Sequence, residues 1–204
     1  MKTVLALAAH PDDIEIGCGG TLASYAAEGV DVHLYVATEG GKGGDGTIRR
    51  AEQEEAARIL GIKCVHWGSF EDTGLPSELN GLIAGIESLL AELSPSIVFV
   101  NHDDDTHQDH RTLARAAHSA TRYVPNVLAY ETPTSNRFDP SLFRDIGKLM
   151  DVKCKALKAH ASQVERTNIQ GLNIVEIARS TAHYRGIQGR INSAEAFVPI
   201  RMQL

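Results

Sequence analysis

The sequence has few cysteines, no long apolar run and no excess of positive charge, and each absence argues against a class of protein. Its three cysteines (Cys18, Cys64 and Cys154) are too few and too scattered for a disulfide framework. With no signal peptide visible, we expect a reducing cytoplasm and cysteines that are buried or inert. No run of 18 apolar residues is present, so we expect no membrane span. A net charge of −6 argues against a nucleic-acid partner, which a basic surface would favour.

The composition is that of a folded globular protein, with 43% hydrophobic and 23% charged residues. Apolar runs alternate with helical patterns along most of the chain. We expect strands at residues 3–9, 30–37, 63–67, 96–100, 127–130 and 196–201, and helices at 21–27, 48–60, 77–93, 110–121, 151–160 and 174–184. Ser77 is expected to cap the third of these helices. This order predicts an α/β fold, a Rossmann-like three-layer sandwich with a mostly parallel sheet, in a single domain covering 1–204.

Two polar turns follow predicted strands at the edge where α/β sheets bind ligands. The first is His10-Pro-Asp-Asp-Ile-Glu15. The second covers residues 102–110, in which seven of nine residues are His or Asp. Because the first strand should lie beside the strand near residue 97, these two turns should face each other. Imidazole and carboxylate groups crowded together favour a divalent cation such as zinc.

This geometry predicts three metal ligands, His10 and Asp13 from the first turn and His110 from the second. The fourth position would remain open to water, as a catalytic zinc site requires, although iron, cobalt or nickel would also suit these ligands. Asp12, next to a ligand but pointing elsewhere, is the expected general base.

The remaining pair of the second turn, His107 and Asp109, is expected to form an imidazole–carboxylate contact. The carboxylate would raise the pKa of His107 and keep it cationic. A cationic His107 beside the metal could stabilise an oxyanion or protonate a leaving amine. By contrast, His33 and His66 are expected to be structural, and the glycines of residues 17–20 to permit close packing of the first helix. The glycine-rich segment 39–46 is expected to be a mobile loop, and Gly40–Gly46 within it is the candidate flap over the substrate.

The first motif in full, Ala9-His-Pro-Asp-Asp-Ile-Glu-Ile-Gly-Cys-Gly-Gly20, together with His107-Gln-Asp-His110, resembles the LmbE/PIG-L family of zinc-dependent N-acetylglucosaminyl deacetylases. Blocks at 49–52, 155–163 and 194–197 extend the resemblance over nearly the whole chain. Asp45-Gly-Thr47 is most similar to the bacillithiol-pathway members, which act on N-acetylglucosaminyl malate.

The resemblance implies hydrolysis of the acetamide on an N-acetylglucosamine-type sugar, a small-molecule partner. It also implies assembly as a homo-oligomer, a trimer or hexamer. The roles it implies are zinc ligation by His10, Asp13 and His110, base catalysis by Asp12, oxyanion stabilisation or acid catalysis by His107 oriented by Asp109, and sugar contact by Arg49.

Two other functions are compatible with an α/β sheet carrying such turns. One is an amidase that splits sugar–thiol conjugates by the same chemistry. The other is a non-catalytic nucleotide-binding module, which the sequence disfavours because no dinucleotide glycine fingerprint or acidic ribose reader follows the first strand.

Overall fold

The computed structural model describes residues 3–167 and 169–203, in which seven strands form one sheet of order β3-β2-β1-β4-β5-β7-β6. Strands β1 to β5 are parallel, and β7 runs antiparallel to both β5 and β6. The mostly parallel α/β sheet predicted from the sequence is therefore confirmed, whereas β6 was not predicted. The strands are β1 Thr3–Ala8, β2 Asp31–Thr38, β3 Cys64–Phe70, β4 Ile97–Asn101, β5 Asn126–Tyr130, β6 Leu142–Asp145 and β7 Ala194–Arg201.

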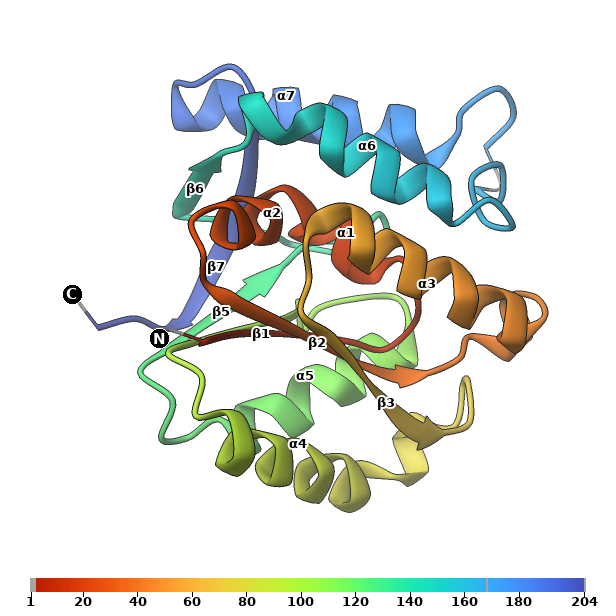
Figure 1. Ribbon diagram of the computed structural model, residues 1–204, viewed down its shortest axis with the longest axis vertical. Coiled ribbons are helices and arrows are strands. Elements are labelled where there is room, and N and C mark those ends of the chain that lie inside the picture. Colours follow the sequence, from red (N-terminus) through yellow and green to blue (C-terminus); the bar gives the residue numbers. More distant parts are fainter. Residues whose placement is uncertain (1–2, 168, 204) are drawn as a thin grey trace.

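The helices cover both faces of this sheet and give the three layers (Figure 1). Helices α4 and α5 lie on one face and α1, α2 and α3 on the other, where α6 and α7 lie over them. The helices are α1 Asp13–Gly17, α2 Gly19–Ala27, α3 Gly46–Leu60, α4 Leu79–Leu93, α5 Gln108–Ala120, α6 Met150–Ala159 and α7 Ile174–Gly189, with short 3₁₀ helices at Gly41–Gly43, Leu75–Ser77 and Gly147–Leu149. In the part of the chain that the structure describes, no helix has the length and apolar character needed to cross a membrane.

Two local expectations were wrong. The polar turn after β1 is mostly helical, because α1 begins at Asp13 and α2 at Gly19. Ser77 does not cap the following helix. Its hydroxyl donates to the carbonyl oxygen of Gly74 at 2.8 Å, and Glu78 precedes α4 instead.

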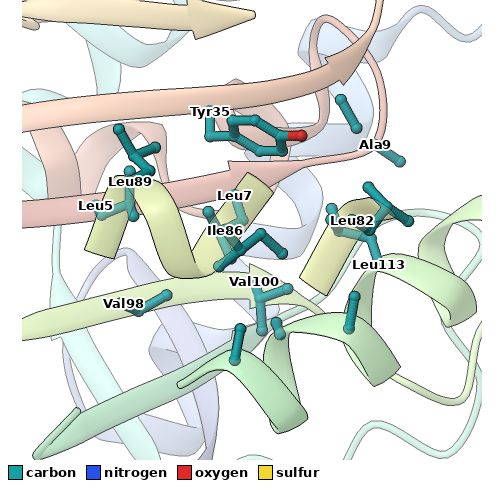
Figure 2. Close-up of a cluster of buried hydrophobic side chains, with 14 of the residues drawn as sticks. Leu5, Leu7, Ala9, Tyr35, Leu82, Ile86, Leu89, Val98, Val100 and Leu113 are labelled. Atoms are coloured by element: carbon teal, nitrogen blue, oxygen red, sulfur yellow. The ribbon is translucent and has the colours of Figure 1, made fainter. Parts of the chain in front are cut away.

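Strand β1 is buried on both faces, which explains its continuous apolar run. Leu5 and Leu7 belong to the cluster under α4 and α5 that Figure 2 shows, whereas Val4, Ala6 and Ala8 belong to the cluster on the opposite face. Each fully buried leucine contributes about 1.5–3 kcal/mol relative to an exposed one. This burial fixes the strand whose carboxyl end carries the first polar turn.

The end of α1 packs directly against β5 through Gly17. A Cβ at this position would overlap the ring of Tyr130. The hydroxyl of Tyr130 lies 2.8 Å from the carbonyl oxygen of Leu7 and 3.1 Å from Oδ1 of Asn101, so the ring is held in place. The expectation that glycine here permits close packing is confirmed.

Candidate active site

The two polar turns meet at the carboxyl ends of β1 and β4, which pair in parallel. Nδ1 of His10 lies 3.3 Å from Nε2 of His110. The carboxylate of Asp13, at the start of α1, lies between them, with Oδ1 3.2 Å from Nε2 of His110 and Oδ2 3.7 Å from Nδ1 of His10. The fold therefore brings together the three side chains that were predicted as metal ligands.

The spacing of the two imidazole nitrogens fits a tetrahedral cation. Zinc–nitrogen bonds of about 2.0–2.1 Å at a tetrahedral angle place two ligand nitrogens roughly 3.3 Å apart. The electrostatic environment also fits. Burial by itself lowers the pKa of His10, but hydrogen bonds with Asp109, Asp13 and Asp72 outweigh burial and raise that pKa well above its usual value. The same negative potential stabilises a divalent cation.

Carboxylates occupy the other side of both imidazoles. Nε2 of His10 lies 3.1 Å from Oδ1 of Asp72 and 3.2 Å from Oδ2 of Asp109. Nδ1 of His110 lies 3.2 Å from Oδ2 of Asp105. Metal-ligating histidines usually donate their second ring N–H to such a partner, which fixes the ring. A cation on Nδ1 of His10 would leave Nε2–H to donate to these carboxylates.

Asp72 and Asp105 were not predicted as part of the site. Asp105 belongs to the His/Asp-rich turn, so the composition of that turn could have indicated that Asp105 is part of the site. Asp72 follows β3, and only the strand order shows that this loop reaches His10.

The expected contact between the Asp109 carboxylate and His107 was wrong. Asp109 faces inward from the first turn of α5, where its carboxylate meets His10 and accepts the backbone N–H of Thr73 at 2.7 Å. Nδ1 of His107 instead accepts the backbone N–H of Asp109 at 3.2 Å, as the cap of α5.

His107 is consequently not the cation that the sequence suggested. Burial, together with the charges of His10 and His110, lowers the pKa of His107 below its usual value. Because Nδ1 accepts a hydrogen bond, the proton of the neutral ring is on Nε2. His107 therefore offers an uncharged N–H donor. Its ring centroid lies 4.6 Å from that of His10.

Asp12 lies at the more open side of the cluster, with 20% of its side chain exposed. Its backbone adopts a positive φ of 91°, and its N–H donates to Oε1 of Gln53 at 3.2 Å. Burial raises the pKa of the Asp12 carboxyl to about 6. The Asp12 carboxylate lies beside Arg49 and that of Asp13 beside His10 and His110, so the two adjacent carboxylates occupy different positions.

Arg49 is almost fully buried beneath this turn. Its guanidinium donates to the carbonyl oxygen of Pro11 at 2.9 Å and to that of Gly40 at 2.7 Å, and it lies 3.6 Å from Oδ2 of Asp12. A Cβ at Gly40, whose φ is +68°, would overlap the guanidinium. Arg49 thus connects the Asp12 turn to the glycine-rich loop, and the sugar contact expected of it stays a prediction.

A buried polar network is joined to the backbone of Asp12 through Gln53. Gln53 donates to Oε1 of Glu15 at 2.8 Å, and Nε2 of His160 lies 3.4 Å from Oε2 of Glu15. Burial by itself lowers the pKa of His160, but the contact with Glu15 outweighs burial and raises it above the usual value. The network joins the end of α6 to the first motif, and sequence reasoning assigned it no role.

An open groove of about 720 Å³ adjoins the cluster at Asp72. It lies at the carboxyl ends of β2 and β3 and along the glycine-rich loop, and its lining includes Lys42, Arg50, Trp67 and Phe70. Half of its ten lining residues are charged and two are aromatic, so the groove offers mainly polar contacts to a ligand.

The fold and this cluster define a Rossmann-like α/β protein with a histidine–carboxylate site at the sheet's carboxyl edge. Residues 5–121 match the PIG-L family, described as GlcNAc-PI de-N-acetylase. The chain belongs to this family, as its motifs predicted.

Individual relatives agree with that membership. The chain is 39% identical over 169 residues to the "Uncharacterized deacetylase YaiS" of Escherichia coli, covering 79% of this chain and 91% of the relative. It is 30% identical to the "Probable N-acetyl-alpha-D-glucosaminyl L-malate deacetylase 2" of Bacillus cereus, covering 80% and 84%. Among solved structures, the protein TT1542 of Thermus thermophilus superposes with a TM-score of 0.84 at 31% identity, covering 100% of this chain and 97% of that one.

Proposed function

We propose that this protein is a zinc-dependent N-deacetylase that removes the acetyl group from an N-acetylglucosamine-type sugar or glycoside. The observation that carries the proposal is the convergence of His10, Asp13 and His110 within 3.7 Å of one another, beside the more exposed carboxylate of Asp12. Family membership and the name of the Bacillus relative support the sugar.

His10, Asp13 and His110 would hold the metal. A zinc ion in such a site supplies Lewis-acid polarisation and makes water more acidic. Asp109 and Asp72 would keep His10 oriented, and Asp105 would do the same for His110. Their negative charge also helps to retain the ion when substrate arrives.

Asp12 accepts the proton of the attacking water as oxygen adds to the acetyl carbonyl carbon. The proton held by Asp12 passes to the sugar nitrogen as the C–N bond breaks, and acetic acid leaves and ionises to acetate. Gln53 and Arg49 position the Asp12 turn through the backbone of Asp12 and Pro11. This positioning keeps the carboxylate at the open side of the cluster.

His107 stabilises the negative charge that develops on the carbonyl oxygen. Its Nε2–H is the remaining donor of a ring whose Nδ1 already accepts the Asp109 N–H. A neutral donor suffices for this role, so His107 need not carry a proton to the leaving amine.

The groove at Asp72 supports a substrate larger than a single sugar. Its two cations are paired, Arg50 with Glu39 at 2.9 Å and Lys42 with Glu71 at 3.3 Å, and Asp72 adds a further carboxylate. This balance favours an uncharged, hydroxyl-rich second group over an anionic one. Gly40–Gly46, of which Gly41 and Lys42 line the groove, is the proposed flap.

An acetate-release assay across N-acetylglucosamine, its malate glycoside, N,N′-diacetylchitobiose and nucleotide sugars tests the proposal. We expect one acetate and one free amine for each turnover, from protein with zinc bound. Mass spectrometry of a sugar–thiol conjugate separates the alternative, because an amidase would split the conjugate without releasing acetate. Turnover of none of the acetylated sugars would contradict the proposal.

Four further expectations from the sequence remain predictions. They are a trimeric or hexameric homo-oligomer, a cytoplasmic location, a single domain over 1–204, and zinc in preference to iron, cobalt or nickel. Metal analysis of protein purified without chelators and measurement of the mass in solution would test the metal and the assembly.

A further inference from the structure

A second group of metal-binding side chains lies at the opposite edge of the sheet. It consists of His33 near the start of β2 and Cys64 and His66 at the start of β3. In the parallel register His33 is opposite Cys64, and Tyr35 is opposite His66. Side chains in register on neighbouring strands share a face, so the three groups project to the side that α4 covers. The catalytic cluster lies at the carboxyl ends of these parallel strands, one strand length away.

The donor atoms are close enough to share one ion. One ligand atom from each of the three residues lies within 4.8 Å of the other two. Nδ1 of His33 is 3.0 Å from Nε2 of His66, and the rings stack with an interplanar angle of 24°. A nitrogen–nitrogen distance of roughly 3.3 Å is needed around tetrahedral zinc, so a shift of a few tenths of an ångström admits the metal.

The surroundings leave this group accessible. His33 is buried, with 8% exposure, whereas Cys64 is exposed and has a free thiol. Cys18 and Cys154 are buried, as expected, whereas Cys64 is exposed, and whether it is inert stays a prediction that the proposal below would overturn. The neighbouring Lys63 is paired with Asp31 at 2.6 Å, so its ammonium is already occupied by a carboxylate.

We propose that His33, Cys64 and His66 form a second metal site that binds one thiophilic transition-metal ion of the zinc type. The ligands are Nδ1 of His33, Nε2 of His66 and the thiolate of Cys64, whose proton is released to solvent. Water fills the fourth position, because the thiol side of the group is exposed. The ion joins the edge strand β3 to β2 and so stabilises the strand that leads to Asp72. This site does not depend on the proposed deacetylase activity.

Titration with Co²⁺ in the presence of a phosphine reductant tests this site directly. The catalytic cluster contains no thiol, and Cys18 and Cys154 are buried, so a thiolate-to-cobalt charge-transfer band reports Cys64. We expect the band to saturate by two equivalents in the unmodified protein, one for each proposed site, and to be absent in Cys64→Ser. In His66→Gln the affinity read from the band should fall more than about tenfold. His118→Gln, which changes a histidine on α5, is the matched control and should keep the band.

Two results would overturn the proposal. One is the absence of a thiolate band at saturating Co²⁺ in the unmodified protein. The other is an unchanged band and affinity in both His33→Gln and His66→Gln, which would mean that Cys64 binds cobalt without the imidazoles. Cys64 is exposed, so Cys64→Ser should fold normally, and circular dichroism checks this.

Discussion

The carboxylate of Asp109 lies 3.2 Å from Nε2 of His10, and it is fully buried while making this contact. The backbone N–H of Thr73 donates to the same oxygen at 2.7 Å, which fixes the carboxylate. Asp109 is therefore placed to orient a metal ligand, and His107 is left to act by itself. Asp109 and His107 therefore have different roles, although they are two residues apart in one short motif.

Asp109→Asn and His107→Gln should consequently affect different quantities. Asp109→Asn should weaken zinc binding about 10- to 100-fold, because it removes the fully buried one of the two carboxylate partners of His10. His107→Gln should leave zinc binding unchanged and lower kcat about 100- to 1,000-fold, the usual effect of losing an oxyanion donor. Competition with a chromophoric chelator measures the first effect and acetate release at saturating zinc the second. Loss of zinc from His107→Gln would contradict this division.

The groove predicts a substrate preference that one charge can reverse. We expect a higher kcat/KM for N,N′-diacetylchitobiose than for the malate glycoside of N-acetylglucosamine, because both groove cations are already paired. Glu71→Lys, at an exposed position in the groove, should lower KM for the malate glycoside. Glu87→Lys on α4 makes the same charge change away from the groove and should not. Equal effects of the two variants would refute a groove contact.

Packing at Gly17 predicts a position-specific loss of stability. Gly17→Ala should lower the free energy of unfolding by about 1–3 kcal/mol, because the new methyl group overlaps the Tyr130 ring. Gly19→Ala is the matched control, since its Cβ would meet its nearest neighbours at an ordinary contact distance of 3.7 Å. Urea denaturation of both variants measures the difference. A loss in Gly19→Ala as large as in Gly17→Ala would show that helix conformation, and not the ring, is responsible.

The His160–Glu15 pair predicts a stability difference that depends on pH. The folded-state pKa of His160 is raised, so its contribution is complete below the unfolded value of about 6.5 and is lost as pH rises through the folded value. His160→Gln should therefore be less stable than the unmodified protein by about 3 kcal/mol below pH 6.5, and by less in alkaline solution. Urea denaturation across this range measures the gap. A gap that stays constant or widens with rising pH would contradict the charged pair.

Much of the fold follows from the sequence because buried strands and their periodic helices are local patterns. The apolar run of β1 predicts its strand, and the helix expected at 48–60 ends where predicted, at the positive-φ Gly61. Strand β6 is only four residues long and partly exposed, and among the described residues β7 is its one partner, so nothing local distinguishes it from a loop. Its existence depends on a pairing across some 50 residues of chain.

Sequence motifs predicted which residues form the site. They predicted less well the contacts that depend on how helices and strands pack. His10, Asp13 and His110 meet because strands β1 and β4 are neighbours, which the α/β pattern implies. The Asp109–His107 pairing failed because adjacency in sequence suggested a contact, whereas the first turn of α5 directs Asp109 inward. The group of His33, Cys64 and His66 arises from strand register, which spacing along the sequence does not reveal.

The central claim is that Asp12 performs catalysis at a metal held by other residues, and Asp12→Asn tests it most directly. Asparagine tolerates the positive φ of this position, and the backbone N–H bond to Gln53 is preserved, so the turn should remain intact. Zinc content and acetate release are measured on the same preparation. We predict zinc content equal to that of the unmodified protein and acetate release reduced about 100- to 10,000-fold. Acetate release at the unmodified rate with zinc bound would contradict the account.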